Sequence, residues 1–340
     1  FHYNKYDREY NENGSLDNYY SESLVAKSER KVKYSDKISY GFGSEYKYDW
    51  GRFTNIGSFY PLSKVDNYVY DFGLFTNAGY KYDDETTLSL FLRADEHKTT
   101  NLNKTYKLNL NKNYKNFDFN ITQSTGLRNP SLYELYGSNG RTDIYKHVAN
   151  PNANPEKSLT KELSIGYKVL DNLYFSTTGY RTYISDALLY DSNFNGGSGY
   201  TNTQKDLKQK GLETNLVFGN KLQKLSLFNI ISSSKKTDGS HQLNRPDMTY
   251  GLNYFKKISS NMLGILDFNL DYKHYGKVFD YNPGITKVDS TDLVNISLSK
   301  NLDKNYFTLK ISNLFDEGYQ RPVGYSQNGR QITLSYKSKF

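Results

Sequence analysis

Apolar and polar residues alternate along most of this chain. Between residues 86 and 95, the even positions from Leu88 to Ala94 are apolar, whereas Ser89, Arg93 and Asp95 occupy odd positions. Successive side chains of a strand point to opposite faces, so a period of two predicts a strand with one apolar and one polar face.

The same alternation recurs throughout the chain and predicts about 14 to 16 strands. Other clear examples are residues 68–80, 117–121, 163–169, 262–272, 294–298, 307–311 and 332–336. Short and long polar connections alternate between these strands: residues 301–305 form a short one, and residues 191–204 and 234–247 form long ones. No segment has a convincing helical period, so the sequence predicts an all-β protein.

Three architectures could use this pattern. Strands of a soluble sandwich are usually about five or six residues long, shorter than many of these, and a solenoid or propeller requires a fixed repeat that the chain lacks. A transmembrane antiparallel β-barrel needs strands of about 9 to 11 residues, apolar outside and polar inside, with aromatic girdles and unequal loops. The barrel fits best, and Tyr68 and Tyr80, at the two ends of one apolar face, suit such girdles.

Composition is consistent with a barrel. The mean hydropathy is -0.79 and no run of about 18 apolar residues occurs, which excludes a helical membrane protein only. A polar lumen and long polar loops lower the mean hydropathy of a barrel in the same way. The 34 tyrosines and 19 phenylalanines favour strands, since aromatic side chains fit a pleated, half-buried surface.

Charge and reactive residues argue against other classes of function. The net charge is +8, but lysine and arginine are scattered rather than gathered in a nucleic-acid-binding stripe. The chain has no cysteine, and its five histidines form no HExxH pair. No GxSxG, Walker or GxGxxG motif occurs. We therefore expect that the protein is not an enzyme.

Three segments carry a more specific signal. They are TGLRNPSLYELYG at residues 125–137, NPNANPEKS at residues 150–158, and the closing stretch 311–340, which contains Asn313-Leu314-Phe315-Asp316. The residues of these three segments, and their order along the chain, resemble those of TonB-dependent outer-membrane receptors. The Gly324-Tyr325 and Gly329-Arg330 steps are most similar to the cobalamin (vitamin B12) receptor branch, although siderophore and haem receptors share much of the pattern.

This resemblance implies a barrel of about 22 strands in the outer membrane of a Gram-negative bacterium. A plug domain bearing a TonB box would close the lumen, and TonB would drive uptake of a scarce nutrient by a monomeric receptor. Residues 1–340 are then expected to be the C-terminal part of the barrel, with the plug outside this segment. A passive outer-membrane channel without a plug is the alternative.

The acidic residues near the start suggest a metal site. Asp7 and Asp17 lie in a stretch that reads as a polar loop, and carboxylate oxygens suit Ca²⁺. By the resemblance, aspartates in early extracellular loops of cobalamin receptors bind Ca²⁺, so these two residues are candidate ligands. A solvated acidic loop is the plain alternative, and no other cofactor is expected.

Candidate ligand-binding residues lie in the predicted outer loops. Asn244 and Arg245 end one loop, and arginine offers a rigid fork of donors for an amide or a carboxylate. Arg245 could equally pair with a lipopolysaccharide phosphate or an acid of the lumen. Phe279 and Tyr281 lie in another loop and could stack on a flat ligand or pack within the loop. Thr54 is a weaker candidate of the same kind.

The two Asn-Pro motifs have architectural interpretations. Pro130 and Gly137 are expected to shape the backbone, and Leu132 and Leu135 to pack. Residues 150–158 read as a loop that holds the chain extended before it enters a strand near Leu159.

Overall fold

The computed structural model describes residues 1–12, 15–57, 60–138, 146–204, 206–236, 240, 242–281 and 285–339. The chain forms two compact units. The first contains residues 1–112, 121–161 and 182–207, and the second contains residues 113–120, 162–181 and 208–340.

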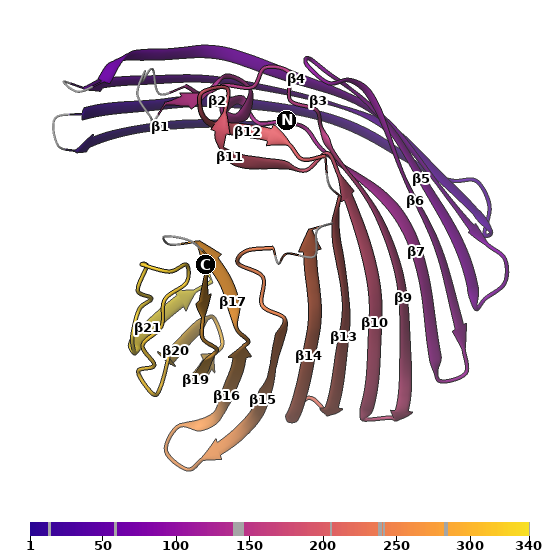
Figure 1. Ribbon diagram of the computed structural model, residues 1–340. Coiled ribbons are helices and arrows are strands. Elements are labelled where there is room, and N and C mark those ends of the chain that lie inside the picture. The colour runs from indigo at the N-terminus through magenta and orange to yellow at the C-terminus, as the bar shows by residue number, and fades with distance from the viewer. Residues whose placement is uncertain are drawn as a thin grey trace. The chain divides into compact units, whose positions relative to one another are not determined.

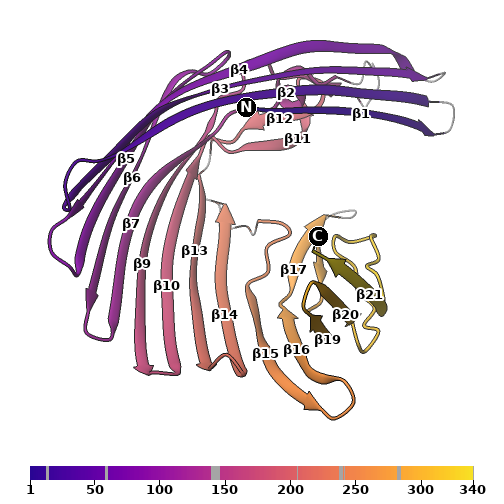
Figure 2. The same cartoon turned by 180° about the vertical axis from the view of Figure 1, so that it is seen from behind.

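Backbone hydrogen bonds join sixteen strands in chain order (Figures 1 and 2). They are β1 (His2–Glu12), β2 (Ser15–Lys33), β3 (Ile38–Gly57), β4 (Tyr60–Lys81), β5 (Thr86–His97), β6 (Asn101–Tyr114), β7 (Phe117–Arg128), β9 (Glu156–Leu170), β10 (Leu173–Ser185), β13 (Leu207–Gly219), β14 (Gln223–Lys236), β15 (Met248–Ser260), β16 (Gly264–Tyr275), β19 (Thr291–Leu302), β20 (Asn305–Ser312) and β21 (Gln331–Ser338). The prediction of an all-β chain with this number of strands is confirmed.

Smaller elements lie in the long connections. The strands β11 (Leu188–Phe194), β12 (Gly197–Asn202) and β8 (His147–Val148) form a three-stranded sheet, and β17 (Val278–Tyr281) pairs with β18 (Ile285–Val288). The one helix among the described residues is α1 (Leu132–Tyr136), which is only five residues long and therefore too short to show a helical period in the sequence.

In β4 and β5 of the first unit, side chains at even positions lie on one face of the sheet and side chains at odd positions lie on the other. Leu74 of β4 pairs with Ser44 of β3 and Ala94 of β5, and Tyr80 pairs with Leu88. In an antiparallel pair, residues directly opposite each other share a face. The predicted apolar residues from positions 68 to 94 therefore gather on one face, which we call the apolar face, and Leu74 remains 56% exposed there.

The opposite face, called the polar face, carries paired charges. Arg93 of β5 binds Asp95 at 2.6 Å and Glu45 of β3 at 3.0 Å. A fixed guanidinium fork between two carboxylates satisfies groups that burial would otherwise penalise. The predicted contrast between the two faces is thus present at the level of side chains.

The second unit repeats this arrangement. Phe268 of β16 pairs with Leu298 of β19, which pairs with Leu309 of β20. On the other face, the Asn295 side chain donates a 3.1 Å hydrogen bond to Asp271.

Alternate connections of the main sheet are short, as predicted. They are residues 34–37, 82–85, 115–116, 171–172, 220–222, 261–263 and 303–304. Lys115 and Asp303 adopt positive φ in two of these turns. Of the remaining connections, residues 98–100 are also short, which departs from strict alternation.

Several predicted loops are β-hairpins instead. Residues 2–12 and 15–20 fall in β1 and β2, residues 191–204 include most of β11 and β12, and residues 275–281 include β17. Polar antiparallel strands can extend a sheet in water because each backbone group still finds a cross-strand partner. The loop interpretation of these stretches was therefore wrong.

The facial sorting predicts that an arginine on the apolar face is far more harmful than one on the polar face. Leu90→Arg should destabilise the folded protein in a bilayer by about 2–4 kcal/mol, because it places a charge against lipid. Urea unfolding in vesicles would measure the loss. The neighbouring Ser89→Arg, on the polar face, is the control, and equal losses for both variants would contradict the assignment.

Candidate ligand-binding site

A cavity of about 640 Å³ lies on the polar face of β1 to β4, in the first unit. This volume is in the range of small-molecule sites. Its walls come from these four strands, from the end of β5, and from the segment that leads into and begins α1. The lining side chains that the register places on the polar face include Tyr6, Arg8, Tyr19, Lys47, Asp49, Phe53, Asp71 and His97, joined by Asn129 and Tyr133.

Polar groups of the cavity are held by one another. Lys47 binds Asp49 at 2.6 Å, and Asn129 donates a 2.9 Å hydrogen bond to Asp71. Lys47, Asp71 and His97 lie opposite one another on three neighbouring strands. Both signs of charge are thus fixed in position at this end of the cavity.

One wall of the cavity is aromatic. Tyr19 contacts Phe53 with ring centroids 5.8 Å apart, and Phe53 contacts Tyr133 edge-on at 6.3 Å. Aromatic pairs of this geometry contribute beyond the area they bury. The cavity therefore offers both apolar ring surface and hydrogen-bonding groups.

The motif at residues 125–137 builds the segment above this wall. Ser131 accepts a hydrogen bond from Glu134 N while the Glu134 side chain accepts one from Ser131 N, which is a capping box. Leu135 is fully buried, and a Cβ on Gly137 would lie 2.4 Å from the Tyr133 carbonyl oxygen. These contacts support the architectural interpretation of Leu135 and Gly137.

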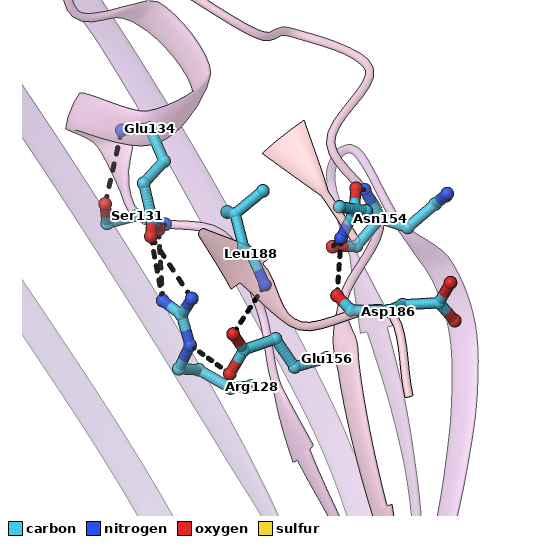
Figure 3. Close-up of polar contacts among 8 residues, drawn as sticks. Arg128, Ser131, Glu134, Asn154, Glu156, Asp186 and Leu188 are labelled. Atoms are coloured by element: carbon cyan, nitrogen blue, oxygen red, sulfur yellow. Dashed lines mark hydrogen bonds and ion pairs between the residues drawn. The ribbon is translucent and has the colours of Figure 1, made fainter. Parts of the chain in front are cut away.

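Arg128, the last residue of β7, ties the two Asn-Pro motifs together (Figure 3). Its Nε donates to Glu156 at 2.7 Å, and its Nη1 donates to Glu134 at 3.1 Å. The other oxygen of Glu156 accepts a 2.7 Å hydrogen bond from Leu188 N. One guanidinium thereby connects the start of β9, helix α1 and β11.

Residues 150–158 are fixed more tightly than a plain loop. Asn150 N donates to the Glu134 carbonyl oxygen at 3.1 Å, and Ala153 is buried. The side chain of Asn202 bridges the backbone of Asn154 and Asp186. The strand that follows begins at Glu156, three residues before the predicted entry point, because the register of the sheet extends into the motif.

The small sheet brings more rings to the same region. The rings of Tyr133 and His147 stack at 5.2 Å, and those of Tyr190 and Tyr200 contact each other at 5.9 Å. A Cβ on Gly199 would lie 2.6 Å from the Val148 carbonyl oxygen, so glycine allows β12 to approach β8 closely. Burial lowers the pKa of His147, which keeps its ring neutral at pH 7.

The register separates Thr54 from this cavity. Thr54 pairs with Asn18 and Lys64, one position away from the pair of Phe53 with Tyr19. Adjacent strand residues face opposite sides, so Thr54 lies on the apolar side and Phe53 lines the cavity. Thr54 therefore does not line this cavity, and its role in ligand binding stays a prediction.

Asp7 and Asp17 are not brought together. Asp7 pairs with Tyr20 and Asp17 pairs with Tyr10 in the β1–β2 hairpin. Three residue positions separate the two pairs, which places the two carboxylates on opposite faces. Among the described residues, no group of three or more histidine, aspartate or glutamate side chains gathers in a way that could hold a metal ion. A Ca²⁺ ion shared by these two residues therefore has no support from the geometry.

In the second unit, two of the predicted ligand-binding segments do meet. Asn244 N donates to the Phe279 carbonyl oxygen at 2.7 Å. The Asn244 side chain donates at 3.2 Å to Asp280, which is 6% exposed and also accepts a 2.7 Å hydrogen bond from Val323 N. Asp280 thus joins three connections that are far apart in the sequence.

The remaining candidates flank this junction. Arg245 is exposed beside Asn244 and interacts electrostatically with Tyr180. Tyr281 ends β17, and its side chain lies outside the described residues. Asn244, Phe279 and Arg245 are therefore neighbours in space or sequence, whereas the cavity of the first unit involves none of them.

The only sequence signal that points to the cavity residues is the alternation of odd and even positions between the two faces of the sheet. Tyr19, Phe53 and Asp71 are ordinary strand residues, and nothing in their own segments distinguishes them. The alternation of β2 to β4 assigns each residue to a face, but only the cross-strand register shows which of them meet.

Comparison with known proteins shows the family of this chain. Residues 1–314 match the family described as TonB dependent receptor-like, beta-barrel. The chain belongs to this family. Its barrels are outer-membrane proteins of Gram-negative bacteria, so the chain lies in the outer membrane.

Solved structures with the same fold carry siderophore, iron or copper in their titles. The siderophore receptor PirA from Acinetobacter baumannii shares 18% identity at a TM-score of 0.76, with 96% of this chain and 55% of that chain covered. The FrpB iron transporter from Neisseria meningitidis shares 15% at 0.74, with 96% and 56% covered. The ferric yersiniabactin uptake receptor FyuA from Yersinia pestis shares 13% at 0.74, with 99% and 57% covered.

These likenesses establish the fold, and the TonB-dependent receptor family is one of receptors rather than enzymes. This receptor chain spans little more than half the length of those solved chains. Among its described residues, no helix has the length and apolar character needed to cross a membrane.

The contacts of Arg128 predict a local loss of structure in this receptor on substitution. Arg128→Gln removes the shared donor of Glu134 and Glu156, and an unmet carboxylate costs about 1–3 kcal/mol. The Arg128 side chain is 45% exposed, so solvent screening should keep the loss at the lower end. Trypsin protection of residues 129–155 would measure it.

Lys168→Gln, which breaks an exposed turn pair with Asp171 at 2.7 Å, is the control for Arg128→Gln. Equal protection in both variants would show that the guanidinium does not hold the segment.

The junction at Asp280 predicts coupled loosening of the two connections that Asp280 holds through Asn244 and Val323. Asp280→Ala leaves the amide groups of Val323 and Asn244 without their acceptor, at a cost of about 1–3 kcal/mol. Hydrogen exchange should rise in residues 242–247 and 319–326 together. Asp289→Ala, at an exposed neighbouring position, should leave both segments protected, and a rise confined to one segment would contradict the coupling.

Proposed function

We propose that the receptor takes up a metal chelate of the siderophore type across the outer membrane, with energy supplied through TonB. The observation that carries the proposal is the family match over residues 1–314. The cavity on the polar face of β1 to β4 supports it, because it combines aromatic surface with fixed charges. Binding would occur on the outer side, and the ligand would then pass inward in a monomeric receptor.

Two features favour an iron chelate over cobalamin. The solved relatives named above carry siderophore or iron in their titles. The resemblance to cobalamin receptors implied a Ca²⁺ site at Asp7 and Asp17, but their carboxylates face opposite sides of the hairpin. Cobalamin and haem belong in a binding panel as well, because the closing motif resembles that of cobalamin receptors and haem receptors share much of the pattern.

The partners follow from the same proposal. TonB would act on a plug domain through its TonB box, and lipopolysaccharide would surround the apolar face. Arg245 is exposed and could bind either a lipopolysaccharide phosphate or an acidic group of the ligand.

Uptake by the full-length receptor should require TonB. Cells that make no siderophore of their own should accumulate ⁵⁵Fe from a panel of ferric siderophores when they express the receptor, and deletion of tonB should abolish the gain. A passive channel would keep its uptake without TonB. Labelled cyanocobalamin, offered with and without Ca²⁺, tests the other ligand: saturable uptake of it alone would contradict the siderophore proposal.

A further inference from the structure

Six aromatic rings from six different elements form one connected cluster in the first unit. They are Tyr19 of β2, Phe53 of β3, Tyr133 of α1, His147 of β8, Tyr190 of β11 and Tyr200 of β12. We call this group the aromatic cluster. Every ring contacts at least one other, with centroid distances from 5.2 to 6.5 Å.

Three of these rings are nearly parallel. The planes of Tyr133 and His147 differ by 14°, and those of His147 and Tyr190 differ by 6°. Tyr200 meets each of the three edge-on, at angles of 75° to 77°. The edge of the Tyr200 ring therefore packs against the stack of Tyr133, His147 and Tyr190, and this contact fixes the orientation of the stacked ring faces.

The cluster is anchored on one side and open on the other. His147 is buried, and Tyr200 packs against the core formed by Val69, Leu135, Ala153 and Leu188. Yet Tyr190 is 60% exposed and Tyr133 is 43% exposed. Within the described residues, these two rings therefore keep faces that a flat group can reach.

The cluster also borders the cavity. Tyr19, Phe53 and Tyr133 belong both to the cluster and to the lining of the 640 Å³ space. A small molecule in that space would therefore meet ring faces that are already fixed in orientation. A pre-ordered aromatic surface loses little entropy when a flat group stacks on it.

We propose that the aromatic cluster is a stacking platform for planar aryl groups of the transported ligand. The inference rests on the proposed uptake function and narrows the ligand to chelators that carry aromatic rings. The neutral rings recognise ring surface rather than net charge. An aryl chelate should thus bind more tightly than an alkyl chelate of the same charge and metal geometry.

A matched pair of probes isolates this property. Gallium tris(N-methylbenzohydroxamate) and gallium tris(N-methylacetohydroxamate) are both neutral, and they differ only in phenyl against methyl groups. Calorimetric titration into full-length receptor in nanodiscs should give a Kd about tenfold lower for the phenyl complex, as expected for one or two ring contacts.

Variants at Tyr190 test whether the difference in Kd between the two complexes comes from the aromatic cluster. Tyr190→Leu should raise the Kd of the phenyl complex by about fivefold and leave the methyl complex unchanged. Tyr190→Phe keeps the ring and should bind like the wild type. Tyr34→Leu removes a ring that is 73% exposed in the turn between β2 and β3, and it should change neither Kd. Since lipid partition of the probe is the same in all variants, differences among them report on the receptor.

Equal affinity for the two probes, or absence of binding by both, would overturn the platform. So would a phenyl preference that survives in Tyr190→Leu and Tyr133→Leu. None of these results would affect the proposed uptake function, which is judged separately by its dependence on TonB.

Discussion

The ladder of backbone hydrogen bonds is the interaction on which the rest of this structure depends. Within a bilayer no water is available to an N–H or C=O group, so each strand must satisfy its backbone on its neighbours. The sixteen strands meet this requirement by pairing in chain order. Once that register is set, every side chain is assigned to a face, because a shift of one residue would exchange the two faces.

The ladder also explains how an unremarkable set of residues becomes a site. Phe53 and Tyr19 lie opposite each other only because β2 and β3 pair without a break over this region. The same register places Lys47 opposite Asp71 on the polar face and carries Thr54 to the other side. Site geometry is therefore a consequence of strand pairing rather than of a local motif.

At the ends of strands and in the long connections, a few charged groups hold segments that the backbone hydrogen bonds of the main sheet do not reach. Arg128 connects two motifs that are separated by a long connection, and Asp280 joins three connections in the second unit. Such groups are effective because each is partly or fully shielded and makes several hydrogen bonds at once. In the first unit, Arg128 holds α1 and β11 in place through Glu134 and Glu156, and thereby helps to position the rings of the aromatic cluster.

The sequence by itself determined the fold class, the approximate number of strands, the alternation of faces and the resemblance to TonB-dependent receptors. Those properties follow from a period of two and from motifs that lie within short stretches. Only the tertiary structure decided which residues meet: that Asp7 and Asp17 face apart, that Phe53 rather than Thr54 lines the cavity, and that Asn244 reaches Asp280. The physical reason is that alternation gives each residue a face but not a partner, and partners are set by the register between strands that are distant in the chain.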